Sequence, residues 1–370
     1  MNARAEAAGR RPLAGVRGWR ACALLAVTLM LPGAALGQGF AGLADASGGF
    51  AAVTAPAALA FPRDHGAHPG FRVEWWYLTA NLTGEDGTGY GVQWTLFRSA
   101  MAPGADAPGW ENGQVWMAHA AATGAGTHRF AETFARGGVG QAGVEAAPFR
   151  AFIDNWSMTA TGAPGDALAG LRLRASGDGF AYDLTLAADR PPVPQGDAGF
   201  SVKSERGQAS YYYSQPFYTV EGTLTLDGRE VAVSGQGWLD REWSSAPLTE
   251  DQEGWDWFAL HLDDGRKLMV YRLRQRGAPA YLAGTVIAAD GTPTPLRPSE
   301  IAAEPTGTAT VGERSLPVRW RLAVPGHGIV VDIEALNAQS WMGTSYAYWE
   351  GPIRVSGSQA GVGYLELTGY

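Results

Sequence analysis

Residues 74–98 read EWWYLTANLTGEDGTGYGVQWTLFR and have the pattern of a β-hairpin. Two runs rich in aromatic and aliphatic residues flank GEDGTG, whose glycines and aspartate favour a tight turn. Residues 254–274, GWDWFALHLDDGRKLMVYRLR, repeat this form around the turn DDG. Trp75 and Trp255 open the two hairpins at matching positions. The repetition predicts two related β-domains, and chance similarity between amphipathic strands is the alternative.

The composition of the whole chain also favours β-structure. Gly accounts for 51 of the 370 residues, and hydrophobic residues make up 46%. Frequent glycines supply turns, while the 14 Trp, 13 Tyr and 13 Phe favour strands and can line apolar pockets. Short strand-like runs separated by Gly, Pro and Asp-Gly continue to the C-terminus without a long helical pattern. The sequence therefore predicts an all-β fold of the barrel or sandwich type.

The N-terminal segment has the pattern of a secretory signal peptide. The basic residues Arg10, Arg11, Arg17 and Arg20 precede the apolar stretch ACALLAVTLMLPGAALG (21–37), which ends in small residues. We expect cleavage after Gly37 and export to the periplasm or the extracellular space, by either the general or the twin-arginine route. An uncleaved membrane anchor is the alternative. Residues 38–60 are rich in Ala and Gly and are expected to form a flexible lead-in.

Charge and cysteine content exclude several classes of partner and chemistry. The chain has a formal net charge of −8, which argues against binding nucleic acid or docking on anionic lipid. No second long apolar run follows the signal segment, so we expect no stable membrane insertion after cleavage. Cys22, the single cysteine, lies in the signal segment, and the mature chain therefore has no thiol chemistry.

Motifs in a fixed order carry a family resemblance. They are DHGAHPGFRVEWWYLTANL (64–82), GQVWMAHAA (113–121), ASYYYS (209–214), GWLDREWSS (237–245), GWDWFALHLDDG (254–265), YWEG (348–351) and GYLELTGY (363–370). With them, the chain resembles the secreted AttH and carotenoid-hydratase-like group of lipocalin-related proteins. The resemblance implies two lipocalin-like antiparallel β-barrels packed side by side, which we place at residues 61–240 and 241–370.

The resemblance implies a function from one of two subgroups. One subgroup contains carotenoid 1,2-hydratases, which add water to a terminal carbon–carbon double bond of an acyclic carotenoid. The other contains exported proteins of unproven activity, often linked to ABC-type export systems and sometimes labelled predicted hydrolases. The signal peptide and the GWDWF and GYLELTGY motifs make this chain similar to the second subgroup.

Hydrating an alkene requires a strong proton donor in a water-poor pocket, and four carboxylic acids are candidates. They are Glu74, Asp240, Glu242 and Asp256. Glu74 shares a strand face with apolar side chains, so it is either functionally buried or a rim residue paired with arginine. Asp256 lies between two tryptophans and is either catalytic or part of a structural salt bridge.

Aromatic and imidazole side chains near these acids are candidates for contact with a ligand. The candidates are Trp76, His119, Tyr212, Trp243 and Trp257. His119 shares a strand face with apolar residues, so it is either a proton shuttle or a hydrogen-bonded core histidine. The three tyrosines 211–213 are expected to alternate between the two faces of a strand.

Arg241 departs from the family pattern. The corresponding motif in the family usually reads Asp-His-Glu-Trp, and in the hydratases its His and Trp are tied to activity. Arginine keeps its proton and cannot act as a general acid or base. We expect Arg241 to hold Asp240 or Glu242 ionised, or to bind an anionic head group. This substitution weakens the hydratase interpretation and favours binding.

Other chemistries have weaker sequence support. The His-x-x-His pair in DHGAHP lacks an identifiable third ligand, so we expect neither a metal nor another cofactor. Ser244 and Ser245 lack the G-x-S-x-G context of a hydrolase, although a triad assembled from distant residues stays an alternative. The leading interpretation is an exported protein that binds a hydrophobic or amphiphilic lipid or isoprenoid. A hydratase-like enzyme and an accessory of an ABC-type permease are the other two.

Overall fold

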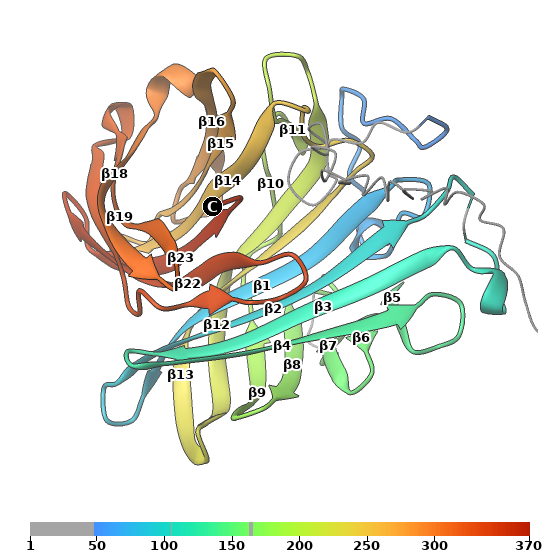
Figure 1. Cartoon of the computed structure of the whole chain (residues 1–370), viewed down its shortest axis with the longest axis horizontal. Coiled ribbons are helices and arrows are strands. Elements are labelled where there is room, and N and C mark those ends of the chain that lie inside the picture. The colour runs from blue at the N-terminus through green and yellow to red at the C-terminus, as the bar shows by residue number, and fades with distance from the viewer. Residues whose placement is uncertain (1–47, 105, 163–165) are drawn as a thin grey trace, which may run out of the picture. The chain divides into compact units, whose positions relative to one another are not determined.

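The computed structural model describes residues 48–104, 106–162 and 166–370, and it contains two large antiparallel sheets in one compact unit (Figure 1). The predicted signal peptide, residues 1–37, and the first part of the lead-in lie outside the described residues. Residues 48–60 contain neither helix nor strand. They contact the first sheet, for example through the Thr54 carbonyl, which accepts a hydrogen bond from the Tyr211 hydroxyl at 3.0 Å.

Strands β1 to β13 form the first sheet among the described residues, in the order β4-β3-β2-β1-β13-β12-β9-β8-β7-β6-β5, with β10 and β11 paired to β12. The sheet curls so that its edge strand β4 comes close to β6 and β8 near the other edge, and it forms a nearly closed barrel (Figure 1). The strands are β1 (Val73–Gly84), β2 (Gly89–Ala100), β3 (Gln114–Gly124), β4 (Thr127–Arg136), β5 (Ala142–Ala146), β6 (Phe149–Ile153), β7 (Trp156–Ala160), β8 (Gly170–Gly177), β9 (Phe180–Ala187), β10 (Val193–Pro194), β11 (Phe200–Val202), β12 (Ala209–Leu226) and β13 (Arg229–Ser244).

Strands β14 to β23 form the second sheet in the described part of the chain, in the order β17-β16-β15-β14-β23-β22-β20-β19-β18, with β21 paired to β22. Its first and last strands pair, and the sheet forms a half-barrel. The strands are β14 (Gln252–Leu262), β15 (Lys267–Gln275), β16 (Ala278–Ile287), β17 (Pro293–Leu296), β18 (Ala302–Val311), β19 (Arg314–Val324), β20 (Ile329–Ala335), β21 (Trp341–Met342), β22 (Tyr348–Gly357) and β23 (Gly361–Thr368).

Short 3-10 helices connect some of these strands. Those in the described residues are η2 (Arg63–His65), η3 (Gly109–Glu111), η4 (Pro298–Glu300) and η5 (Pro325–His327). The all-β prediction with two antiparallel barrels is therefore confirmed, with the second barrel only half formed. The division expected between residues 240 and 241 falls inside β13, and the second sheet begins at Gln252.

Local sequence explains the hairpins that shape both sheets. The predicted hairpins at 74–98 and 254–274 are β1–β2 and β14–β15, and each begins its own sheet. The long hairpin β12–β13 turns at Asp227 and Gly228, which have φ values of 49° and 79°. Positive φ at both turn residues is the geometry that matches the twist of paired strands, and Asp-Gly tolerates it best. This hairpin carries several of the residues discussed below.

Strand alternation divides the side chains of each sheet between two environments. One face of the first sheet encloses a core that includes Trp76, Leu78 and Trp243. The corresponding face of the second sheet encloses a separate core that includes Phe258 and Leu260. The opposite faces of the two sheets meet each other, with β23 against β1 and β22 against β2. A third apolar cluster, rich in aromatic residues, fills part of this contact.

Candidate active site

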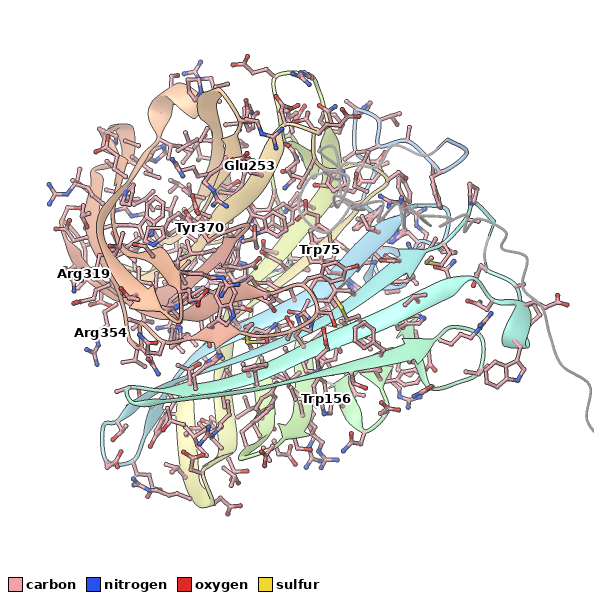
Figure 2. All side chains as sticks on the ribbon, in the orientation of Figure 1. Trp75, Trp156, Glu253, Arg319, Arg354 and Tyr370 are labelled. Carbon is pink, nitrogen blue, oxygen red and sulfur yellow. The ribbon has the colours of Figure 1, made fainter. Side chains whose placement is uncertain are left out.

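A cavity of about 460 Å³ lies between the two sheets. Met101 and Tyr346 line it and are exposed, so they mark its opening to solvent. Trp75, labelled in Figure 2, lies where the first sheet faces the second. The cavity has the size of a small-molecule site. Its aromatic wall comes from both sheets and includes Trp75, Phe97, Tyr212, Trp255, Trp257 and Tyr271.

Strand β13 sends neighbouring residues to opposite faces of the first sheet. Trp238 belongs to the cluster between the sheets, and Asp240 and Glu242 line the cavity. Arg241 and Trp243 point to the interior of the first sheet. The prediction that Arg241 holds Asp240 or Glu242 ionised is therefore wrong, because strand alternation places its guanidinium on the other side of the sheet.

Asp240 accepts three hydrogen bonds at the wall of the cavity. Its carboxyl accepts the Tyr212 hydroxyl at 2.5 Å, the Ser214 hydroxyl at 2.5 Å and the indole N–H of Trp238 at 2.6 Å. The Tyr212 oxygen also lies 3.3 Å from the indole nitrogen of Trp257 across the sheet contact. Burial raises the pKa of Asp240 to about 7 against the opposing effect of these donors. Asp240 can therefore take up or release a proton near neutral pH.

Glu366 and Glu350 are acids of the second sheet that face the first. They lie directly opposite each other on β23 and β22. Glu366 lines the cavity and accepts the indole N–H of Trp255 at 2.8 Å, while Glu350 is buried and accepts the hydroxyl of Tyr77. Burial and the charges of neighbouring carboxylates raise the pKa of both acids. Two adjacent acids of this kind hold a proton between them rather than both being ionised, because two buried like charges repel each other.

His119 lines the cavity from β3. Its Nδ1 lies 2.9 Å from the Tyr348 hydroxyl of the second sheet, and its Nε2 lies 3.0 Å from a Glu132 oxygen. Burial lowers the pKa of His119 and outweighs the opposing effect of Glu132, so the ring is neutral at physiological pH. Both ring nitrogens have partners. This agrees with a hydrogen-bonded histidine and also with a proton shuttle.

Glu242 is paired with a lysine of the same cavity. The Lys203 ammonium lies 2.7 Å from a Glu242 oxygen, and Ser210 donates its hydroxyl to the same oxygen. The ammonium also lies 4.2 Å from the centre of the Tyr271 ring and 4.8 Å from that of Tyr212. Glu242 therefore belongs to an ion pair at the cavity wall. It is a weaker candidate for a proton donor than Glu366.

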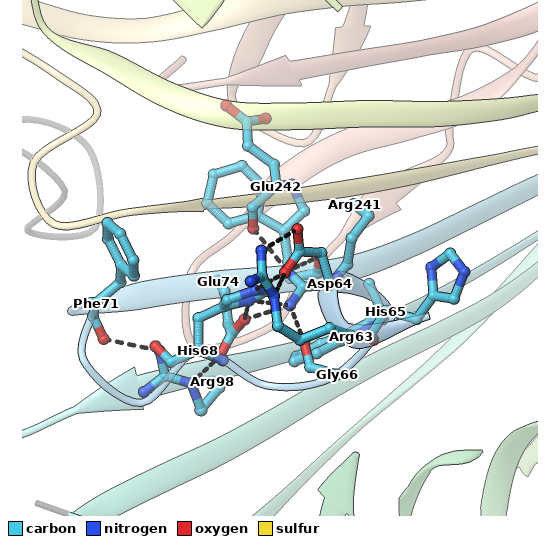
Figure 3. Close-up of polar contacts among 12 residues, drawn as sticks. Arg63, Asp64, His65, Gly66, His68, Phe71, Glu74, Arg98, Arg241 and Glu242 are labelled. Carbon is cyan, nitrogen blue, oxygen red and sulfur yellow. Dashed lines mark hydrogen bonds and ion pairs between the residues drawn. The ribbon is translucent and has the colours of Figure 1, made fainter. Parts of the chain in front are cut away.

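Glu74 lies in a charge network inside the first sheet (Figure 3). Its carboxylate accepts hydrogen bonds from Arg98 and Arg241, and His68 approaches it at 3.2 Å. Burial would raise the pKa of Glu74, but Arg241 and Arg98 outweigh burial and hold the pKa below its ordinary value. Glu74 is thus buried, as predicted from strand parity, but it is ionised and committed to two arginines. Figure 3 shows Glu242 directed away from this network.

Asp256 occupies a comparable position inside the second sheet. Its carboxylate accepts hydrogen bonds from Arg272 at 2.7 Å, Arg274 at 2.6 Å and the Tyr370 hydroxyl at 2.7 Å. The structural interpretation of Asp256 therefore agrees with its contacts. Glu74 and Asp256 both lie on the first strand of their sheet and face its interior, but Asp256 matches Trp76 and Glu74 matches Gly254 when Trp75 and Trp255 are aligned.

The predicted ligand contacts divide between the cavity and the first core. His119, Tyr212 and Trp257 line the cavity. Trp76 and Trp243 belong to the core of the first sheet, where they lie on either side of Arg241, with ring centres 3.8 and 4.9 Å from its guanidinium carbon. The structure therefore brings three of the five predicted contacts together around one space.

The residues considered for hydrolase or metal chemistry make hydrogen bonds and ring contacts within the fold. Ser244 and Ser245 donate their hydroxyls to backbone carbonyls of residues 209 and 51, and the ring of His68 stacks on Trp243 at 4.0 Å. Among the described residues, no group of three or more side chains is arranged to hold a metal ion. Within the same ranges, no helix has the length and apolarity needed to span a membrane.

Five residues of the site were not identified from the sequence. The YWEG and GYLELTGY motifs contain Tyr348, Glu350 and Glu366, and an acid flanked by leucines in a strand was a usable signal for the last. Tyr77 follows from the alternation of EWWYLTANL, because it occupies the face opposite to Trp76. Lys203 lies at the end of β11 without any local sequence signal.

The sequence profile of the AttH-like family matches residues 52–370, which include both sheets and every residue of the cavity. The chain belongs to the AttH-like family. An AttH structure from Nitrosomonas europaea has 31% sequence identity and a TM-score of 0.75, and the match covers 87% of this AttH-like chain and 100% of that one. Kievitone hydratase from Nectria haematococca matches at 18% identity and a TM-score of 0.62, covering 86% and 96%; this likeness concerns the fold alone. Among curated proteins, none matches this chain significantly.

Proposed function

We propose that this AttH-like protein is an acid–base enzyme that adds water to a carbon–carbon double bond of a hydrophobic or amphiphilic small molecule. The observation that supports the proposal is the pair Glu366 and Asp240. These two acids have raised pKa values and line one aromatic-walled cavity from opposite sheets. An acid and a base tuned by their surroundings are what such an addition needs.

In this proposal, Glu366 is the proton donor and Asp240 is the base. Glu366 gives its proton to one alkene carbon, and the electron pair of the double bond forms the new C–H bond. The oxygen of a water molecule bonds to the resulting cationic carbon, and Asp240 accepts the proton that the water loses. Asp240 suits the second role because three donors stabilise its carboxylate, whereas the donor to Glu366 is the indole N–H of Trp255.

The aromatic wall of the cavity would stabilise the cationic intermediate. Trp257 and Tyr212 come from different sheets and meet at 3.3 Å beside Asp240. Electron-rich rings attract a cation by about 2 kcal/mol or more where water is excluded. The volume of about 460 Å³ accommodates one small molecule or the end of a longer isoprenoid chain. Acyclic isoprenoids with a terminal double bond are therefore the first substrates to test.

The test is turnover in heavy-oxygen water. We expect the purified mature protein, incubated with a panel of acyclic isoprenoids, to form an alcohol that carries the heavy oxygen, as detected by mass spectrometry. Glu366→Gln should lower the rate by about 100-fold or more, because amides do not supply a strong acid. Glu253→Gln is the control, since this glutamate lies on β14 and is exposed. Product formation that is unchanged in Glu366→Gln would contradict the assignment of the donor.

Binding without turnover is the second candidate function, because the aromatic wall would hold an apolar ligand whether or not it reacts. It is favoured if the isoprenoids quench tryptophan fluorescence and are recovered unchanged. Export of the protein and association with an ABC-type permease stay proposals from the sequence, to be tested by cell fractionation and by co-purification.

A further inference from the structure

A row of polar side chains runs from solvent to the acids between the sheets. It begins at Glu132 on β4, whose side chain is 19% exposed, and continues to His119, which is 1% exposed. The Tyr348 hydroxyl follows at 2.9 Å from His119, and Glu350 lies two residues further along β22, on the same face of the strand. The row thus crosses from the first sheet to the second.

The row continues from Glu350 to the proposed proton donor. Tyr77 donates its hydroxyl to Glu350, and Glu350 lies directly opposite Glu366 on the neighbouring strand. Tyr77 and Tyr348 therefore lie on the two sides of Glu350, one toward the cavity and one toward His119. Both phenols stay protonated because burial raises their pKa well above the ordinary value. Each can pass on a proton by giving up its own hydroxyl proton as it accepts another.

We propose that Glu132, His119, Tyr348, Glu350 and Tyr77 form a proton relay that reloads Glu366 from solvent. The proposal rests on the proposed function in that it assigns Glu366 as the group that loses a proton in each turnover. A ligand that fills the cavity excludes water from Glu366, so a second route for protons is then required. The relay supplies that route from the β3–β4 side of the molecule.

The proton balance of the relay is simple. With Glu350 ionised and His119 carrying its proton on Nδ1, Glu132 takes a proton from water and passes it to Nε2 of His119. His119 gives the Nδ1 proton to Tyr348, and Tyr348 gives its hydroxyl proton to Glu350. Glu350 is ionised at this point because it has already reloaded Glu366 through Tyr77 in the same manner. One proton enters and restores Glu350, and the proton that Asp240 took from water leaves to solvent when the product departs. His119 ends with its proton on Nε2 and returns to the Nδ1 tautomer before the next proton is taken up.

In the loaded state of the relay, which is the state before turnover, each member has the charge that its surroundings favour. Glu350 is protonated, His119 is neutral with its proton on Nε2, and Glu132 is ionised and accepts that proton in a hydrogen bond. Burial raises the pKa of Glu132, but the hydrogen bonds from His119 and Ser345 outweigh it and lower the pKa. Ser345 donates to Glu132 from both its backbone N–H and its hydroxyl, which fixes the carboxylate at the entrance.

Infrared spectroscopy after a rapid pH jump tests the relay in the protein alone. Protonated carboxylic acids have a distinct C=O band, and Glu350→Gln assigns the band of this residue. Tyr348→Phe and Tyr77→Phe are a matched pair, because each removes one buried hydroxyl on one side of Glu350. We expect Tyr348→Phe to slow the loss of the Glu350 band by at least about 10-fold while Tyr77→Phe leaves the rate unchanged. The extent to which the band is lost at the new equilibrium should be the same in both variants as in the wild type.

The opposite outcome overturns the relay. If Tyr77→Phe slows the response and Tyr348→Phe does not, protons reach Glu350 through the cavity. Equal rates in wild type and both variants also contradict the proposal. His119→Phe should reproduce the effect of Tyr348→Phe, and Met117→Leu, which changes another cavity residue on the same strand, should not. Since no substrate is present, this result is independent of whether the protein hydrates an alkene.

Discussion

At the scale of single residues, Asp240, Arg241 and Glu242 show how a strand separates neighbours in sequence. Asp240 and Glu242 reach the cavity, while the guanidinium between them in sequence binds Glu74 inside the first sheet. Arg241 occupies the position at which the family resemblance predicts histidine, and its guanidinium binds Glu74 rather than Asp240 or Glu242. This substitution therefore does not bear on Asp240 and Glu242.

The raised pKa values of the cavity acids predict a pH-dependent stability. A carboxyl with a raised pKa binds a proton in the folded state that the unfolded chain has already released, so stability falls as pH rises toward the folded pKa. Asp240 behaves in this way, with a pKa of about 7 in the folded protein. The pKa values of Glu350 and Glu366 are raised as well, so these acids contribute in the same direction. Burial lowers the pKa of His119 and His261, so their contribution to stability increases as pH rises toward 6.5. Burial also lowers the pKa of Lys267 to about 8, so its contribution to stability increases as pH rises above about 8.

We therefore expect the Tm to fall from pH 6.5 to about pH 8, measured by differential scanning fluorimetry in buffers of equal ionic strength. Glu350→Gln should flatten the slope, because its amide does not titrate. Glu253→Gln, at an exposed position, should keep the wild-type slope. A Tm that rises across this window would contradict the assignment of raised pKa values.

The charge network of Glu74 predicts a large loss of stability on neutralisation. Glu74→Gln leaves Arg98 and Arg241 buried without their carboxylate, which should cost about 3–5 kcal/mol in the free energy of unfolding. Asp183→Asn breaks an exposed pair with Arg172 and should cost less than about 1 kcal/mol. Urea denaturation measures both values, and similar losses would show that burial of the network matters little.

At the scale of elements, strand alternation made the interior and exterior faces of β1 and β14 predictable from sequence. The burial of Glu74 follows from the apolar face on which it lies, and the outward position of Trp257 follows in the same way. The pairing that places Glu350 opposite Glu366 did not follow, because the two residues belong to separate strands whose register depends on the whole sheet. The contact of Tyr77 with Glu350 depends on how two sheets meet, which no local pattern encodes.

The faces of β13 and β14 predict which tryptophan reports on a ligand. Trp257 lines the cavity, whereas Trp243 lies in the core of the first sheet under His68. Energy transfer from tryptophan to bound Nile red should fall clearly in Trp257→Phe and change little in Trp243→Phe, at a temperature at which both variants are folded. A larger loss in Trp243→Phe would place the ligand inside the first barrel.

At the scale of the whole molecule, the candidate site requires both sheets. The first contributes Asp240 and Tyr77, the second contributes Glu366 and Glu350, and neither sheet alone holds an acid together with its base. Composition and motif order were enough to predict an all-β chain with two barrels. They were not enough to place the cavity between the barrels, because that position depends on the outer faces of two sheets from separate parts of the chain.

Processing of the N-terminus is a prediction that concerns the entire chain. The signal segment predicts that protein recovered from the host envelope begins at Gln38, after cleavage following Gly37. Intact-mass spectrometry of the exported protein checks this directly. A mass that includes residues 1–37 would instead favour the uncleaved anchor.

The most direct test of the central claim, that the cavity between the sheets is the functional site, is a crystal structure with farnesol bound. We predict density for the isoprenoid between the sheets, in contact with Trp255 and Trp257 and with its terminal double bond beside Glu366. Density inside the first barrel next to Trp76 and Trp243, with the space between the sheets filled by water, would contradict the claim.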